Sequence, residues 1–292
     1  METSTQLTAK ALFNKDEVKH KFQELLGKRS TSFITSVLQI VASNTLLAKA
    51  DPTSIYHSAA VAATLDLPLN NNLGFAYIVA YNAKQADGQY KQVAQFQMGY
   101  KGFIQLAQRS GQFKTISASP IYEGQLIEQN PLTGYKFDFT KIKKSDLVIG
   151  YAAYFQLLNG FEKTLFMTVD ELKRHGMKYS QTFKKGFGLW KDDFEAMAIK
   201  TVLKLLLAKF APLSVEMQQA VITDQGIINN EEATDITYVD NDVVEIDKEA
   251  ERVVLMIQGA KTPEDLNKLK EHVKEEQLPL FNSKMVELQT KI

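Results

Sequence analysis

Two short motifs place cations beside glycines at the two ends of a predicted helix. The stretch QMGYKGFIQLAQRSGQF, residues 97–113, contains GYKG at 99–102 and RSG at 109–111. Lysine and arginine side chains bind phosphates, and glycines let backbone amides approach an anion closely. The same residues also suit a strand-to-helix turn followed by a helix stop. From the residues alone, a phosphate site and a well-made turn both remain open.

A second segment interleaves cations with aromatic rings. Residues 177–189, MKYSQTFKKGFGL, predict a loop, and Trp190 and Lys191 follow it directly. Binding of single-stranded nucleic acid needs cations along a groove and flat rings on which bases stack. The pattern therefore indicates a nucleic-acid ligand. Tyr100 and Trp190 also lie on apolar helical stripes, so each suits a core position equally well.

The charges of the chain are segregated although its formal net charge is zero. Residues 1–220 carry 26 Lys and Arg against 18 Asp and Glu, whereas residues 221–292 carry 8 against 16. A basic body with an acidic C-terminal region suggests a polyanionic partner and a separate module that does not bind it.

Several catalytic and cofactor motifs are missing from the sequence. The nearest match to a nucleotide-binding P-loop, LLGKRS at 25–30, lacks the upstream glycine and the hydroxyl directly after the lysine. Neither a GxGxxG fingerprint nor a nucleophile elbow is present. The chain has no cysteine, so disulfides and thiolate metal sites are excluded. The four histidines stand at no metal-ligand spacing: His20, His57, His175 and His272.

A metal-dependent nuclease is the alternative function. Glu171-x-Lys173 resembles the second half of a nuclease motif, with Asp138 or Asp146 as the upstream carboxylate. However, Thr168 and Glu171 also form the pattern of a helix capping box, which explains the glutamate without catalysis.

Apolar periodicity predicts an α+β fold that would position these residues. We expect N-terminal helices and a curved antiparallel sheet, a β-hairpin plus further strands, packed on helices. The predicted helices cover 15–26, 32–47, 51–65, 100–110, a short element from Thr168 to Gly176, and 190–210. The predicted strands cover 73–81, 91–98, 113–122, 135–139, 148–158 and 162–167.

The chain divides by composition into three parts. We expect a core over residues 1–220, an acidic, disordered linker over 221–247, and a small helical C-terminal module over 248–292. In that module, Thr262 is the predicted N-cap of a helix that begins at Pro263. No apolar run is long enough to span a membrane and the N-terminus lacks a signal-peptide core, so we expect a cytoplasmic protein.

Three ordered segments resemble the RecT family of phage and prophage recombinases, which are single-strand annealing proteins. They are ADPTSIYHSAAVAATLDLPLNNNLGFAYIVAYN at 50–82, QFQMGYKGFIQLAQRSGQFKTI at 95–116 and WKDDFEAMAIKTVLKLLL at 190–207. The resemblance covers about residues 15–215 and excludes the acidic C-terminal region.

The resemblance implies an oligomeric DNA-binding protein, a ring or helical filament, without bond-making or bond-breaking catalysis. Such proteins anneal complementary strands and promote strand exchange without ATP, with Mg²⁺ at most as a counterion of the DNA. The partners implied are single-stranded DNA, the annealed duplex, a 5′-to-3′ exonuclease and a host single-strand-binding protein. The last two would bind the C-terminal region, in the bacterial cytoplasm.

Carried onto this chain, the resemblance nominates DNA-binding residues in the matching segments and the loop between them. GYKG at 99–102 and RSG at 109–111 match the central motif of the family. Lys101 and Arg109 of this central motif are expected to contact phosphates, and Tyr100 either stacks on DNA or packs. The remaining candidates are Lys114, Lys178, Lys184, Lys185, Trp190, Lys191, Lys200, Lys204, Asn70, Asn71 and Asn72. The three asparagines suit a polar turn equally well.

Overall fold

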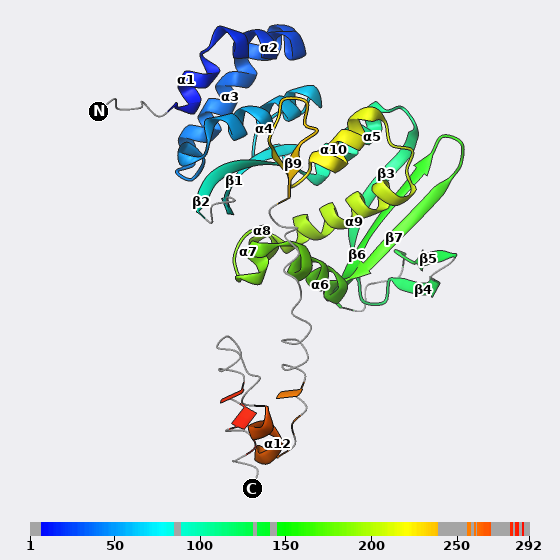
Figure 1. The fold of residues 1–292 in the computed structure, drawn as a ribbon. Coiled ribbons are helices and arrows are strands. Elements are labelled where there is room, and N and C mark those ends of the chain that lie inside the picture. The colour runs from blue at the N-terminus through cyan, green and yellow to red at the C-terminus, as the bar shows by residue number, and fades with distance from the viewer. Residues whose placement is uncertain are drawn as a thin grey trace. The chain divides into compact units, whose positions relative to one another are not determined.

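The computed structural model describes residues 7–84, 89–130, 133–140 and 145–238, and short stretches farther on: 256–257, 260, 262–269, 281–282, 284–285 and 288. The chain forms two compact units, residues 1–241 and 242–292. The larger unit combines helices with antiparallel strands, so the predicted α+β class is confirmed (Figure 1).

The N-terminal part of the larger unit is helical. Its elements are α1 Ala9–Phe13, α2 Asp16–Leu26, the 3-10 turn η1 Gly27–Arg29, α3 Ser30–Ser43, the 3-10 turn η2 Leu47–Lys49, and α4 Pro52–Thr64. Helix α4 begins where it was predicted, with Asp51 as N-cap and Pro52 in the first turn. Every residue from Ser54 to Ala63 is buried. Because α4 is buried on all sides, it forms the centre of this half of the unit.

A β-hairpin joins α4 to the central motif. Strands β1 Ala76–Lys84 and β2 Tyr90–Met98 pair antiparallel, with Ala76 opposite Met98. The Ser54 hydroxyl of α4 accepts a hydrogen bond from the Ala94 amide at 2.7 Å, which ties the helix to β2. Helix α5, Tyr100–Arg109, follows where the sequence predicted a helix, and Gly99 is its N-cap.

The second half of the unit is a sheet with a helix across one face (Figure 1). Its strands, in spatial order, are β3 Phe113–Tyr122, β6 Val148–Leu157 and β7 Glu162–Thr168, and helix α9, Phe194–Phe210, packs on them. Strand residues alternate between faces. Phe166 therefore joins Ile121 and Ala152 in a separate cluster with the hairpin of β4 Leu126–Asn130 and β5 Gly134–Phe137. The strands predicted as one curved sheet thus form separate antiparallel sheets.

Three helices connect β7 to α9: α6 Val169–Tyr179, α7 Gln181–Lys184 and α8 Leu189–Asp192. The predicted capping box is confirmed, since Thr168 and Glu171 bond reciprocally at the start of α6. Gly176 does not end α6, because it lies inside the helix against Trp190 and a Cβ there would be 2.9 Å from that ring. The helix predicted over 190–210 is interrupted at Asp193, whose carboxylate caps α9.

The structure differs from the predicted core boundary at residue 220. Helix α10, Val215–Thr223, crosses that boundary, and strands β8 Ile227–Ile228 and β9 Ile236–Thr237 follow it. Ile228 is buried in the main core, and the Phe96 amide of β2 donates to the Gly226 carbonyl at 3.2 Å. Residues 221–238, predicted as linker, therefore belong to the larger unit. The rest of that prediction, 239–247, lies outside the described residues.

The smaller unit has a core of its own. Ile257, Ala260, Leu266, Phe281 and Leu288 form a buried cluster. Helix α12, Pro263–Lys268, begins with Thr262 as its N-cap, as predicted. Most of the other C-terminal helices predicted from the sequence, 249–258 and 280–291, lie outside the described residues.

The glycines of the central motif serve a close approach between two backbone segments. The Gly99 amide donates to the Phe75 carbonyl at 2.9 Å. A Cβ on Gly99 would lie 2.0 Å from the Gly74 carbonyl oxygen, and one on Gly102 would lie 2.3 Å from the Phe75 carbonyl oxygen. The first turn of α5 therefore packs directly on the backbone that leads into β1, and only glycine leaves room for it.

We predict that Gly102→Ala lowers the free energy of unfolding by about 1–3 kcal/mol, because the added methyl group overpacks this contact. Urea unfolding of the purified variant measures the loss. The matched control is Gln108→Ala, an exposed change on the same helix that should stay within about 0.5 kcal/mol of the parent. A Gly102→Ala protein as stable as this control would contradict the close packing.

Candidate nucleic-acid interface

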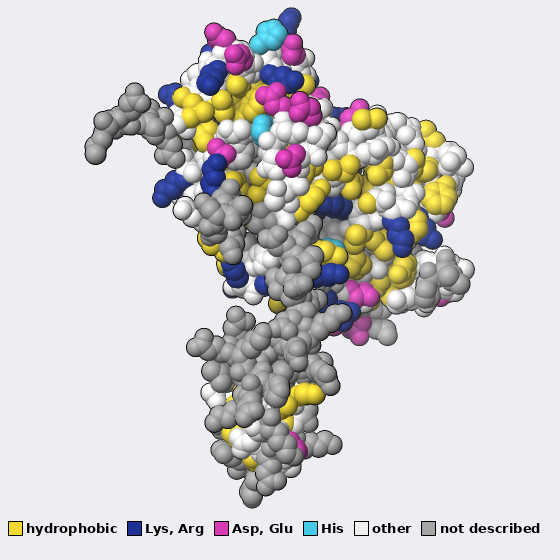
Figure 2. Space-filling view, in the orientation of Figure 1, with side chains coloured by type: hydrophobic (Ala, Val, Ile, Leu, Met, Phe, Trp, Pro, Cys, Tyr) yellow, Lys and Arg dark blue, Asp and Glu magenta, His cyan; other side chains and the backbone are white. Residues whose placement is uncertain are grey.

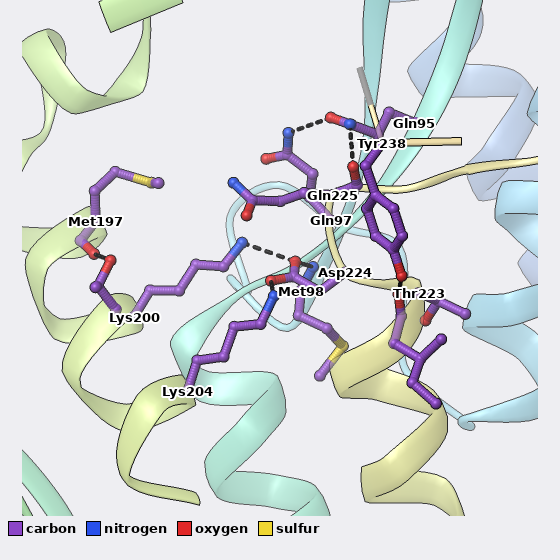
Figure 3. Close-up of polar contacts among 12 residues, drawn as sticks. Gln95, Gln97, Met98, Met197, Lys200, Lys204, Thr223, Asp224, Gln225 and Tyr238 are labelled. Carbon is purple, nitrogen blue, oxygen red and sulfur yellow. Dashed lines mark hydrogen bonds and ion pairs between the residues drawn. The ribbon is translucent and has the colours of Figure 1, made fainter. Parts of the chain in front are cut away.

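Lys200 and Lys204, two predicted phosphate contacts, converge on one buried carboxylate (Figure 3). Lys200 Nζ lies 2.9 Å from Asp224 Oδ1, and Lys204 Nζ lies 2.7 Å from Asp224 Oδ2. The Met98 amide, at the end of β2, donates to Asp224 Oδ1 at 2.9 Å. We call these three charged side chains the ion triad; it joins α9, β2 and the residue that follows α10.

The ion triad has an excess positive charge. Burial alone would raise the pKa of the Asp224 carboxyl, but the two ammonium groups outweigh burial and hold that pKa below its usual range. Asp224 is therefore ionised and neutralises one of the two lysines. The Lys200 side chain is 8% exposed and that of Lys204 is 25% exposed. The uncompensated charge is thus closest to solvent at Lys204.

Buried glutamines extend this polar contact along β2. The Gln97 side-chain amide donates to Gln95 Oε1 at 2.8 Å, and Gln95 donates in turn to the Gln225 carbonyl (Figure 3). The backbone that follows Asp224 is therefore bonded to β2, which holds the carboxylate beside its lysines.

His175 of α6 is half-buried and is influenced by the charge of Lys204. Burial lowers its pKa, and Lys204 and Lys178 lower it further, so the ring is neutral at physiological pH. Its centre lies 4.6 Å from that of Tyr179 and 6.3 Å from that of Trp190. Two predicted cations, Lys178 and Lys204, are thus brought to one neutral aromatic group.

Arg109 binds the chain itself. Its guanidinium donates to the Leu65 carbonyl at 2.8 Å and to the Asp66 carbonyl at 2.7 Å, where α4 ends. Asp66 has a φ of 50°, an unusual backbone conformation for a residue other than glycine, and its carboxylate also accepts from Arg29 at 2.6 Å. The arginine predicted to contact phosphate therefore stabilises the end of α4.

Lys101 has an exposed ammonium group at the start of α5. Its aliphatic stem lies over Gly74, close to the turn made by the three asparagines. In that turn, Asn70 Oδ1 accepts the Asn72 amide at 3.0 Å, while Asn71 and Asn72 are exposed. Lys101 therefore lies close to exposed amide side chains. Asn70 stabilises the turn, which is one of the two roles that the sequence predicted for it.

The predicted aromatic platforms are both inside the fold to some degree. Trp190 is buried and packs against Phe183 and Phe194, with ring centres 5.8 Å apart in each case. Tyr100 is half-buried against the core. Burial raises the pKa of Tyr77, and the charges of Tyr100 and Asp193 raise it further.

The other predicted cations are exposed: Lys114, Lys178, Lys184, Lys185 and Lys191. Lys114 stands at the start of β3, apart from the lysines of α6–α8. In Figure 2, Lys and Arg side chains lie among hydrophobic ones in the part of the larger unit around α6 and α7.

Comparison with known proteins decides the family. The RecT family model matches residues 31–242, which is most of the chain. The chain belongs to the RecT family. It is accordingly a single-strand annealing protein of DNA recombination, as the resemblance implied. The RecT match extends past residue 220 to the end of the larger unit, so it includes Asp224.

Two curated relatives are similar to the chain. The uncharacterised protein YqaK of Bacillus subtilis is 50% identical over 231 residues, which cover 79% of this chain and 75% of that protein. Protein RecT of Escherichia coli is 28% identical over 180 residues, which cover 61% of this chain and 65% of that protein.

Sequence reasoning about this RecT-family chain missed Asp224. The residue stands in VITDQG, a segment without catalytic or ligand spacing, and its lysines precede it by 24 and 20 positions. An aspartate at the end of a helix is usually exposed, so the sequence does not predict that Asp224 is buried. Only the packing of α9 against β2 and α10 brings the three charges together.

Two carboxylates of the nuclease alternative, Glu171 and Asp138, accept hydrogen bonds from residues close to them in sequence. Glu171 accepts the Thr168 amide at 2.8 Å, and Asp138 accepts the Thr140 amide at 3.0 Å. Over the part of the chain that the structure describes, no three His, Cys, Asp or Glu side chains are grouped as a metal site, and no helix is long and apolar enough to cross a membrane.

We predict that Asp224→Ala lowers the free energy of unfolding by about 3–5 kcal/mol, because it leaves two partly buried lysines without their anion. Lys200→Ala should also destabilise the protein, whereas Lys209→Ala, an exposed change on the same helix, should cost under about 1 kcal/mol. Urea unfolding compares the three variants. A Lys200→Ala protein with full stability but weakened DNA binding would instead assign Lys200 to a phosphate.

Proposed function

We propose that this RecT-family chain binds single-stranded DNA through its exposed lysines and anneals complementary strands as an oligomer without ATP. The observation that carries the proposal is the charge of α6–α8. From Leu172 to Lys191 the chain has six Lys or Arg and no Asp or Glu. Five of these cations are on α6 and α7 or directly after α7, all are exposed, and Lys101 adds another at the start of α5.

Charge neutralisation is the physical step that annealing requires. Two DNA strands repel each other until their phosphates are compensated, and lysines that bind phosphates release condensed counterions. The protein then has no bond to make or break. It holds one strand extended, and the second strand pairs with it. With no P-loop in the sequence, the proposal gives ATP no part and treats Mg²⁺ as a counterion of the DNA.

Assembly of the protein and docking of partners are assigned to separate parts of the chain. The N-terminal helices α1–α3 are our candidates for contacts between subunits of a ring or filament that supports strand exchange. The 242–292 unit is our candidate for docking a 5′-to-3′ exonuclease or a single-strand-binding protein in the bacterial cytoplasm. It is folded around its own buried cluster, which suits a separate docking module.

We predict that Lys101→Ala weakens single-stranded DNA binding alike for all sequences and reduces the log–log salt slope by about 0.7, the value for one lost phosphate contact. Fluorescence anisotropy over a salt series measures both quantities. Lys209→Ala, which removes an exposed lysine of α9, is the control and should leave the slope unchanged.

The same proteins are then tested with two complementary labelled oligonucleotides in the absence of nucleotide. Faster duplex formation with intact strands supports the proposal, and shortened strands on a denaturing gel would instead support the nuclease. A Lys101→Ala protein with an unchanged salt slope would remove Lys101 from the interface.

We predict that a chain truncated after Asn241 anneals DNA in vitro but loses recombination in cells, since it retains the larger unit and lacks the docking module. A chain truncated after Ala220 should fail to fold, because it loses Asp224 and the buried Ile228. Circular dichroism and the annealing assay separate the two truncations. Loss of annealing in a folded 1–241 protein would show that the C-terminal unit takes part in annealing itself.

A further inference from the structure

Four large apolar side chains are exposed within thirteen residues of α6–α8. Met177 is 47% exposed, Tyr179 39%, Phe187 54% and Leu189 51%. Isolated exposed apolar residues are ordinary, but a group of them marks a binding surface. The cations of the same segment alternate with them along the chain. We call residues 177–189, which hold these side chains with Lys178, Lys184 and Lys185, the aromatic–lysine segment.

The fold has already used other aromatic residues of this segment for its core. Phe183 and Trp190 pack on each other, and a Cβ on Gly176 would touch both rings. Phe187 lies between these two residues in sequence but has most of its area in solvent. The segment thus buries some of its aromatic rings but leaves Phe187 exposed. An exposed ring on which a base could stack is therefore found at Phe187, and not at Trp190 as the sequence predicted.

The backbone around Phe187 is held in one conformation. Gly186 and Gly188, on either side, have φ values of 78° and 90°, which favour glycine. A Cβ on Gly188 would lie 2.7 Å from the Thr182 hydroxyl, and the Phe187 amide donates to the Thr182 carbonyl at 3.0 Å. A backbone fixed in this way loses little conformational entropy when a ligand covers Phe187.

The positive charge of α6–α8 indicates which class of ligand the exposed rings bind. The cations of α6–α8 form no ion pair with any acidic side chain in the described part of the chain. A ligand with regularly spaced anions and flat apolar groups matches both features, and unpaired DNA has phosphates and bases in that arrangement. An apolar protein surface would match the rings but would leave these lysines desolvated and unpaired.

We propose that Phe187 stacks on an unpaired base of the bound strand while Lys184 and Lys185 bind its phosphates. The inference rests on the proposed DNA binding and adds the residues that recognise the single-stranded state. A base stacked on a side chain keeps its pairing edge free for a second strand. Within a finished duplex the bases stack on each other, so the ring has no base face to cover.

The experiment compares Phe187→Ala with Tyr90→Ala, which removes a ring that is 71% exposed on β2. Phe187→Ala should weaken binding to a single-stranded oligonucleotide by roughly 5- to 100-fold with an unchanged salt slope, as loss of one stacked base predicts. Lys185→Ala should instead reduce that slope by about 0.7. Phe187→Trp should restore affinity, whereas Phe187→Leu, which keeps apolar volume without a ring, should not.

An abasic oligonucleotide isolates the contribution of the bases. The parent and the Phe187→Ala protein should bind this ligand equally, because only phosphates remain. The inference is overturned if Phe187→Ala weakens abasic and normal DNA to the same extent, or if Phe187→Leu retains full affinity. It is also overturned if the variant binds DNA normally but changes its mass in light scattering, which would assign Phe187 to a subunit contact. If the parent protein itself binds no DNA, the proposed function fails instead.

Discussion

One buried carboxylate controls the arrangement of the larger unit. Asp224 is ionised inside the protein, and a buried charge is tolerated only where opposite charges and hydrogen bonds replace its water. Lys200 and Lys204 from α9 and the Met98 amide from β2 supply these contacts. Three segments that are distant in sequence must therefore meet at one point before any of them is stable there. The net stabilisation by such a triad is small, but the cost of an incomplete one is large, so it specifies the packing.

The central motif acts first through its backbone. Gly99 and Gly102 bring the start of α5 onto the Gly74–Phe75 backbone, and Arg109 at its other end bonds to the end of α4. Both contacts fix the helix at its two termini. The consequence for function is indirect: with its ends held, α5 presents Lys101 to solvent from a rigid position. The central motif, which suggested a phosphate site, thus fixes α5 and places Lys101 at its exposed start.

Local signals in the sequence were sufficient for much of the fold. The capping box at Thr168 and the Asp51-Pro52 helix start each depend on neighbours within a few residues, and the structure has both. Residues 215–238 were harder, because two-residue strands and a nine-residue helix leave a weak periodic signal. Their order comes from contacts with β2 and α9, which no local pattern contains.

The candidate site was less predictable than the fold for the same reason. A lysine in a sequence has no mark that shows whether its charge will face solvent, as Lys101 does, or a buried acid, as Lys200 does. Aromatic residues are equally ambiguous, since Trp190 and Phe187 stand three positions apart and have opposite exposures. Which ring is available depends on the packing of Gly176 and on the glycines around Phe187, and both are properties of the folded chain.

The ion triad also constrains how this protein can evolve. A substitution at Asp224 alone leaves two cations without their anion, and a substitution at either lysine weakens the compensation of the carboxylate. Each single step passes through a less stable protein, whereas replacing the whole group by apolar residues of similar volume need not. We therefore expect positions 200, 204 and 224 to vary together among relatives, with all three charges kept or all three lost in a lineage.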